Sequence, residues 1–185
     1  MNKRAFSLLL VFLLLPLPAC ASSSRKSAEA LREGVLSRFP QSFEASLTVS
    51  LGEEISEYRF SLRADGDGVF LTVLEPEALS GLSARVTGDD LSLSYDGILF
   101  AGETPEGLEI SPLTLIPGAL EALRNGILTA SRFSGKELFA DFTRYRGEDA
   151  LTYRFTFHRD EGTVASVQVF HEDREIASIL FFPAL

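Results

Sequence analysis

Residues 69–100 read VFLTVLEPEALSGLSARVTGDDLSLSYDGILF, and this stretch decides the predicted fold. Apolar residues recur at every second position around Leu82 and around Leu93, which is the period of a β-strand with one wetted face. In residues 69–74, one face is wholly apolar and the other is apolar except for Thr72. This predicts a strand covered on both sides by protein or by an apolar ligand. Tight turns separate the runs, and Asp96-Gly97 is a strong hairpin signal because both positions tolerate positive φ. The stretch therefore predicts antiparallel strands joined by short turns.

The same alternation extends outward from this stretch. Upstream, residues 43–51 and 58–63 predict a hairpin with one apolar and one charged face. Downstream, the expected strands lie around residues 138–142, 151–157, 165–169 and 176–182. Turns are expected between them at residues 146–149, 160–162 and 172–173. An antiparallel sheet of about ten strands curls upon itself.

Two helices interrupt the strands. The apolar stripe of residues 25–39 predicts an N-terminal helix that Pro40 ends. Residues 102–117 lose the alternation and are expected to form a loop, after which Pro117 opens a short helix. We expect this helix to lie across the open side of the sheet. The predicted fold is mainly β (α+β): a strongly curved antiparallel sheet forming an unclosed β-barrel, with both helices against it.

The first nineteen residues have the composition of a signal peptide. Lys3 and Arg4 form a basic start, residues 5–15 are an apolar run interrupted only by Ser7, and prolines follow. The run is too short for an ordinary membrane span. The sequence therefore predicts an exported protein.

Two cleavage sites compete at the end of this segment. Leu17-Pro18-Ala19-Cys20 resembles a bacterial lipobox, in which the cysteine is lipid-modified and becomes the first residue; Pro18 departs from the usual pattern. Alternatively, Ala19-Cys20-Ala21 is an ordinary cleavage site, and the protein is secreted. The lipobox is favoured because Cys20 is the only cysteine and a serine-rich segment follows it. We predict a signal peptide over 1–19, a lipid-anchored tether over 20–26 and a folded domain over 27–185, held on the extracytoplasmic face of the cell membrane.

Charge and composition exclude several classes of function. The formal net charge is −9, and loss of Lys3 and Arg4 makes the mature chain more negative still. An acidic chain does not favour nucleic acid or anionic lipid surfaces, so membrane attachment is expected through the anchor alone. With no cysteine inside the domain, the fold has no structural disulfide and depends on its apolar core.

No catalytic or metal-binding motif is present in the sequence. His158 and His171, the only histidines, are placed on polar strand faces near turns. The serines have no G-x-S-x-G context, and no glycine-rich loop follows a strand and opens a helix. The Asp65-to-Gly68 stretch resembles a calcium loop only weakly, because the downstream bidentate glutamate is missing. We therefore predict no enzyme, no metal and no cofactor.

The layout resembles the superfold of the LolA and LolB lipoprotein carriers, which includes the RseB-type sensors. The resemblance is sharpest between Phe60 and Gly126, in the motifs Leu74-Glu75-Pro76, Leu79-Ser80-Gly81, Gly88-Asp89-Asp90 and Tyr95-Asp96-Gly97. It looks most like small lipoproteins of Gram-positive bacteria, including the GerS-type germination lipoproteins. One departure is that LolA has no lipid anchor, whereas this chain is expected to have one, as LolB does.

The resemblance implies a bent sheet that wraps a hydrophobic cavity. A single curled layer also has an inner face too large for two helices to cover, so residual apolar surface is expected. We expect an apolar ligand, an acyl chain or a lipoprotein, to bind there. The alternative is a module that stabilises or localises a partner enzyme, as in GerS-type proteins, and a homodimer is a further alternative. The residues expected to line the cavity are Leu47, Val49, Tyr58, Phe60, Leu62, Leu71, Val73, Leu93, Leu120, Leu123, Phe142, Tyr153 and Phe155.

Overall fold

The computed structural model describes residues 17–65, 68–88, 90–103, 110–146 and 149–183, and it forms one open antiparallel sheet. Several segments that the sequence analysis discusses lie outside the described residues. They are the predicted signal peptide up to residue 16, residues 66–67 of the calcium-like stretch, turn positions 89 and 147–148, and residues 104–109 of the predicted loop. Eleven strands follow the order β6-β5-β4-β3-β2-β1-β11-β10-β9-β8-β7. Their bounds are β1 Gln41–Leu51, β2 Glu54–Ala64, β3 Val69–Glu75, β4 Ser83–Thr87, β5 Asp90–Tyr95, β6 Ile98–Glu103, β7 Ile127–Ser134, β8 Glu137–Arg146, β9 Asp149–His158, β10 Thr163–His171 and β11 Arg174–Pro183.

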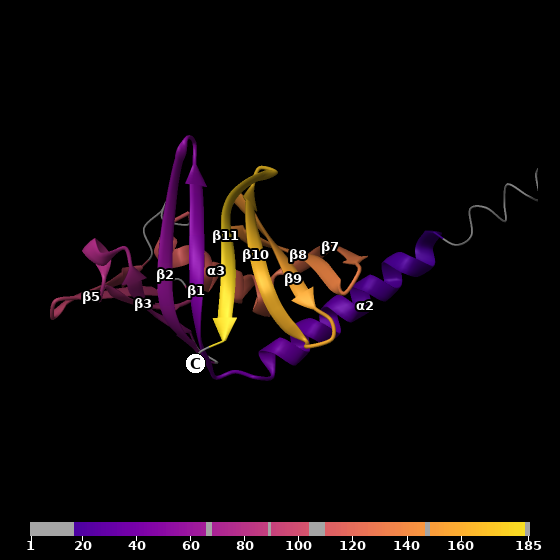
Figure 1. The fold of residues 1–185 in the computed structure, drawn as a ribbon, viewed down its shortest axis with the longest axis horizontal. Coiled ribbons are helices and arrows are strands. Elements are labelled where there is room, and N and C mark those ends of the chain that lie inside the picture. Colours follow the sequence, from indigo (N-terminus) through magenta and orange to yellow (C-terminus); the bar gives the residue numbers. More distant parts are fainter. Residues whose placement is uncertain (1–16, 66–67, 89, 104–109, 147–148, 184–185) are drawn as a thin grey trace, which may run out of the picture.

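The topology consists of two wings joined in the middle. β1 to β6 form one meander and β7 to β11 form the other, and each strand pairs with its neighbours in the chain. The two wings meet where the first strand pairs antiparallel with the last, from Phe43 opposite Pro183 to Val49 opposite Ala177. Figure 1 shows β1 and β11 side by side at the centre of the sheet. We call this β1–β11 pairing the seam.

Two helices cover the concave face of the sheet. α2 spans Leu17–Leu36 and contacts β7, β8, β10 and α3, while α3 spans Pro112–Asn125 and contacts strands of both wings. In Figure 1, α3 lies behind the central strands and α2 runs beside the wing that ends at β7. A short 3-10 turn, η1 Glu77–Leu79, links β3 to β4. The predicted mainly β fold, an unclosed curved sheet with two helices, is confirmed.

Alternation of side chains places the core on the concave face. The register sets Ala45 opposite Phe60 and Leu47 opposite Tyr58, so apolar positions of neighbouring strands form continuous rows. Phe60, Leu47 and Ala45 have no exposed surface. Burying a large apolar side chain contributes about 1.5–3 kcal/mol, so these rows and the buried face of α3 stabilise the fold together.

The start of α3 differs from the expected one. The prediction that Pro117 opens the helix is wrong, because the helix begins five positions earlier at Pro112. Ser111 caps it: its hydroxyl accepts the N–H of Leu113 at 3.2 Å, and the Thr114 hydroxyl accepts the Ser111 N–H at 3.2 Å. Pro112 follows the cap, where the missing proline N–H costs no hydrogen bond. Pro117 lies inside the helix and is buried.

α2 also differs in its bounds from the predicted helix of residues 25–39. It begins at Leu17 and ends at Leu36, so residues 20–26, which we expected to form a tether, are helical. Ser24 is 3% exposed, and its hydroxyl donates to the carbonyl oxygen of Ser131 in β7 at 3.1 Å. The division into signal peptide, tether and domain stays a prediction.

Two strand predictions are corrected. The strand β7, which Ile127 opens, lies in a segment for which the sequence pattern predicts no strand. Residues 69–74 were expected to be covered on both faces. In β3, Val69, Leu71 and Val73 are buried, whereas Phe70 is 49% exposed on the outer face between Arg63 and Arg85. The second apolar face of this strand is therefore outer surface in the described chain.

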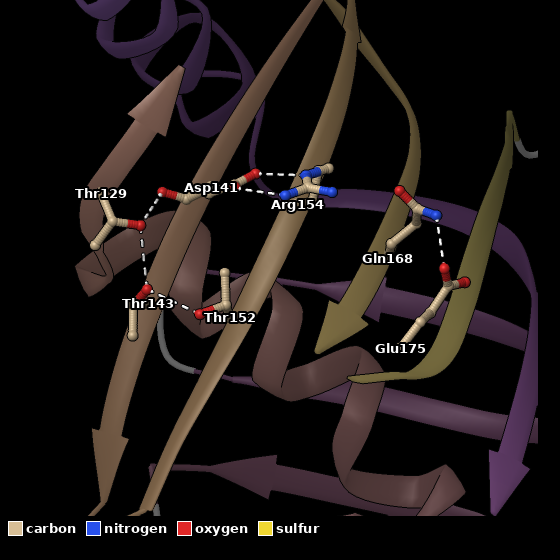
Figure 2. Close-up of polar contacts among 7 residues, drawn as sticks. All are labelled: Thr129, Asp141, Thr143, Thr152, Arg154, Gln168 and Glu175. Atoms are coloured by element: carbon tan, nitrogen blue, oxygen red, sulfur yellow. Dashed lines mark hydrogen bonds and ion pairs between the residues drawn. The ribbon is translucent and has the colours of Figure 1, made fainter. Parts of the chain in front are cut away.

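The outer face of the β7–β11 wing carries a polar network, which Figure 2 shows. Arg154 donates to both carboxylate oxygens of Asp141 at 2.8 and 2.9 Å, and its guanidinium lies 4.7 Å from the ring centre of Phe170. The hydrogen bond to Asp141 raises the pKa of Arg154. A second chain links the hydroxyls of Thr129, Thr143 and Thr152 at 3.2 and 3.0 Å. This network fixes the register of the wing from outside.

Candidate ligand pocket

A pocket of about 390 Å³ opens at the end of the sheet where α2 ends. Its walls come from the end of α2 and the loop that follows it, from helix α3, and from strands β1, β9, β10 and β11. Ten apolar side chains line it: Val35, Phe39, Phe43, Leu120, Leu123, Phe155, Val164, Ala165, Phe181 and Phe182. Five polar residues complete the lining: Arg38, Gln41, His158, Glu161 and Thr163. The volume falls within the range of about 300–1,000 Å³ that is usual for small-molecule sites.

The inner wall of the pocket is aromatic and rigidly packed. Phe43 of β1 meets Phe181 of β11 edge-on at 5.5 Å, diagonally across the seam. Phe155 of β9 is 1% exposed and packs edge-on against Phe142 at 5.5 Å. Leu123 of α3 is 1% exposed and closes the inner end. A ligand that enters this pocket therefore meets hydrocarbon on several sides.

Polar groups gather on the turn between β9 and β10. The guanidinium of Arg38 donates to the backbone carbonyl of Glu161 at 3.3 Å, and the carboxylate of Glu161 accepts from the hydroxyl of Thr163 at 3.2 Å. Gly162 has a φ of +64°, and a Cβ there would lie 3.2 Å from the Arg38 nitrogen. Glycine thus lets the turn and the arginine approach each other closely. His158, expected on an exposed strand face, is half-buried and lines the pocket.

Two arginines fix the helices that border the pocket. Arg32 of α2 donates to the backbone carbonyls of Arg124 and Gly126 at the end of α3, and its guanidinium lies 5.1 Å from the ring centre of Phe142. Arg124 donates to the carbonyl of Asp65 and lies 5.4 Å from the ring centre of Phe39. Cationic donors satisfy carbonyl groups that a helix end leaves without partners. Both helices and the loop at Phe39 are thereby held in one arrangement.

A tight contact on α3 sets how deeply this helix sits in the sheet. Tyr153 of β9 is 1% exposed, and a Cβ on Gly118 would lie only 2.4 Å from its hydroxyl oxygen. Burial raises the pKa of Tyr153 to about 12, while the charge and hydrogen bond of Arg144 oppose part of that rise. Only glycine at position 118 allows the helix to approach the tyrosine this closely.

The structure places the predicted cavity residues in two environments. Leu120, Leu123 and Phe155 line the pocket. Tyr58 and Leu93 are half-buried and pack against the core. The others are buried in the core and do not line this pocket: Leu47, Val49, Phe60, Leu62, Leu71, Val73, Phe142 and Tyr153. Their part in binding a ligand stays a prediction.

Sequence reasoning missed the opening of the pocket. Arg38, Phe43 and Phe181 were not among the expected cavity residues, although strand alternation already turned Phe43 inward. The sequence feature that could have pointed to them is the short connection around Arg38, Phe39 and Pro40, between the predicted helix and the first strand. Such a connection brings a helix end and a strand end together.

The described residues contain no group of three or more His, Cys, Asp or Glu side chains that could hold a metal ion. None of the helices in the part of the chain that the structure covers is long and apolar enough to cross a membrane.

Comparison with known proteins gives a likeness of fold without a family match. No family model matches the sequence, and no curated protein matches it. A solved structure of a DUF1329 family protein from Desulfovibrio piger is similar, with a TM-score of 0.52, 9% identity, and coverage of 88% of this chain and 91% of that one.

Two further solved structures are similar over most of their length. One is an uncharacterised conserved protein from Thermus thermophilus, with a TM-score of 0.48, 12% identity, and coverage of 85% and 88% of the two chains. The other is a LolA superfamily protein from Nitrosomonas europaea, with a TM-score of 0.42, 10% identity, and coverage of 88% and 91%. The open antiparallel sheet with helices on its concave face is the unclosed, curved architecture that the resemblance implied. This likeness concerns the fold.

Proposed function

We propose that this protein is a non-catalytic lipoprotein of the cell envelope that binds an apolar ligand, such as an acyl chain, in the pocket. The observation that supports this most is the pocket of about 390 Å³ walled by Phe43, Phe155 and Leu123. Apolar walls with a few polar groups at one side are typical of sites for small apolar or amphipathic molecules. The LolA-like fold supports the same role.

The proposed attachment to the membrane runs through Cys20. Cys20 lies near the start of α2, and Figure 1 shows this end of the helix extending beyond the sheet. A lipid on that residue would hold the domain at the extracytoplasmic face. Stable anchoring needs more than one acyl chain, and lipobox processing supplies several.

Filling the pocket is expected to abolish ligand binding. Ala165 lines the pocket, and Ala165→Trp would place an indole ring in the space that the ligand needs. We expect the affinity for a fluorescent fatty acid, cis-parinaric acid, to fall at least roughly tenfold, because a tenfold loss corresponds to only about 1.4 kcal/mol. The measurement is a fluorescence titration of the wild type and the variant.

The matched control for this titration is Ser61→Trp. Ser61 is exposed on β2, away from the pocket lining, so the same ring is added without filling the pocket. Wild-type affinity in Ala165→Trp, or no binding of the fatty acid to the wild type, would contradict the proposed ligand role.

A second candidate function is a protein-interaction module, and the edge strand β6 favours it. Ile98, Leu99 and Phe100 are 56%, 69% and 64% exposed, although they are consecutive and apolar. β6 ends the sheet on one side, whereas the other edge, β7, is contacted by α2. An open apolar edge accepts a further strand from a partner, which would be an envelope enzyme or a second copy of this chain.

A charge on this edge is expected to break such an association. Lys on an edge strand opposes pairing with another strand, so Leu99→Lys should release a stoichiometric partner or dissociate a dimer. The measurement is crosslinking in native membranes followed by sedimentation of the purified protein. Ser94→Lys on β5 adds the same charge one strand inward and should leave the association unchanged. An association that survives Leu99→Lys would rule out β6 as the surface.

A further inference from the structure

The pocket lining includes an arginine that forms no ion pair within the described part of the chain. Arg38 is exposed, and its hydrogen bond goes to a backbone carbonyl, that of Glu161, at 3.3 Å. None of the ion pairs among the described residues includes Arg38. A guanidinium has five N–H donors in a planar fork, and one backbone carbonyl leaves most of them available.

The carboxylate beside Arg38 is turned to another partner. The Glu161 side chain accepts from the Thr163 hydroxyl at 3.2 Å, while its backbone carbonyl is the group that faces Arg38. His158 and Gln41 also line the pocket and bring further N–H donors. The polar part of the lining therefore offers several donors and one carboxylate that is already hydrogen-bonded.

Apolar surface begins directly behind these donors. Phe39 follows Arg38 in the chain and lines the pocket, and the wall continues to Leu123 and Phe155, which are each 1% exposed. A molecule that satisfies both parts has a charged head and a hydrocarbon tail. If only the tail bound, the guanidinium of Arg38 would have no anionic partner. A charge-assisted hydrogen bond is about twice as strong as a neutral one, so an anionic head would add to the binding.

We infer that the pocket selects a single-chain amphiphile with an anionic head, carboxylate or phosphate, which pairs with Arg38 while the tail occupies the apolar interior. This inference rests on the proposed ligand role of the pocket and adds the class of ligand. The head forms charge-assisted hydrogen bonds to the guanidinium, whose planar fork matches two oxygens of either acid.

The test compares an acid with its neutral ester. The full-length chain, carrying Cys20→Ser so that neither its own lipid nor a detergent competes, is titrated with cis-parinaric acid and with the methyl ester. We expect the acid to bind about tenfold more tightly than the ester, a ratio that one charge-assisted contact can supply. Arg38→Gln should remove this preference by weakening the acid alone. Glu161→Gln, which removes the neighbouring negative charge, should strengthen binding of the acid.

The controls separate charge from packing and from folding. Arg63→Gln removes an exposed arginine from the outer face of β2 and should leave both affinities unchanged. Arg38→Lys keeps the positive charge and should restore part of the preference. If the site recognises the anionic head, palmitate and hexadecyl phosphate should displace cis-parinaric acid. Hexadecanol, which has no charge, should not displace it.

The outcomes also separate this inference from the proposed function. Equal affinities for acid and ester, or equal losses in Arg38→Gln and Arg63→Gln, would overturn the assignment of Arg38 while the apolar pocket still binds its ligand. If neither the acid nor the ester binds the wild type, the proposed ligand-binding function is wrong, and the inferred preference for an anionic head is wrong with it.

Discussion

Replacing Gly118 by alanine is expected to lower the free energy of unfolding by about 1 kcal/mol. Overpacking costs about 1–3 kcal/mol and outweighs the gain of about 1 kcal/mol that alanine brings to a helix. The new Cβ would lie 2.4 Å from the hydroxyl of Tyr153, a side chain that is 1% exposed. Because Tyr153 is buried, either its ring or α3 must shift to make room for the new Cβ. Urea unfolding followed by circular dichroism measures the loss.

A second substitution tests whether the hydroxyl is the cause. In the Tyr153→Phe background the nearest atom to the new Cβ is the ring carbon at 3.3 Å, so Gly118→Ala should cost much less. The control is Gly34→Ala in α2, where a Cβ meets nothing within 4 Å and should stabilise the helix by about 1 kcal/mol. Equal costs of Gly118→Ala in both backgrounds would show that the contact with the hydroxyl does not limit the packing of α3.

Replacing Cys20 by alanine is expected to move the protein from the detergent phase to the aqueous phase. Lipobox chemistry needs a thiol to accept diacylglycerol, and alanine offers no nucleophile. Each buried methylene contributes about 0.8 kcal/mol to membrane binding, so loss of the acyl chains removes essentially all of the attachment. Detergent-phase partitioning of wild type and variant measures the effect.

The companion variant for the anchor is Ser23→Ala, which alters an exposed α2 residue after the proposed lipid site and should partition like the wild type. Circular dichroism should show the same fold in all three proteins. Wild-type protein in the aqueous phase with Ser22 as its first residue would establish ordinary secretion and end the anchor proposal.

The strands were predictable because alternation is a strong signal on a sheet with one buried face. Residues 151–157 show it clearly, and Tyr153, Phe155 and Phe157 are indeed buried. β7 escaped prediction because most of its residues are exposed and a shift in register after Leu128 breaks the period of two. Pro117 misled the helix assignment because two prolines compete for the first turn. The cap at Ser111 decides in favour of Pro112.

The pocket was harder to predict than the fold. Alternation tells which side chains turn inward, but it does not tell which inward space another element fills. α3 fills the centre of the concave face, so Phe60 and Phe142 are core residues with no exposed surface. The pocket remains at one end, where Arg38, Phe43 and Phe181 meet from segments far apart in the chain. No local pattern carries that information.

The seam between β1 and β11 has a consequence for folding. Every other strand pairing joins neighbours in the chain, whereas the seam brings Phe43 beside residues near Pro183. Closing a long loop costs entropy before any contact repays it, and distant contacts slow folding. We expect each wing to gain structure first and the seam to form late. A mutation at Ala45 in the seam should then speed unfolding more than it slows folding, as is usual for contacts absent from the transition state.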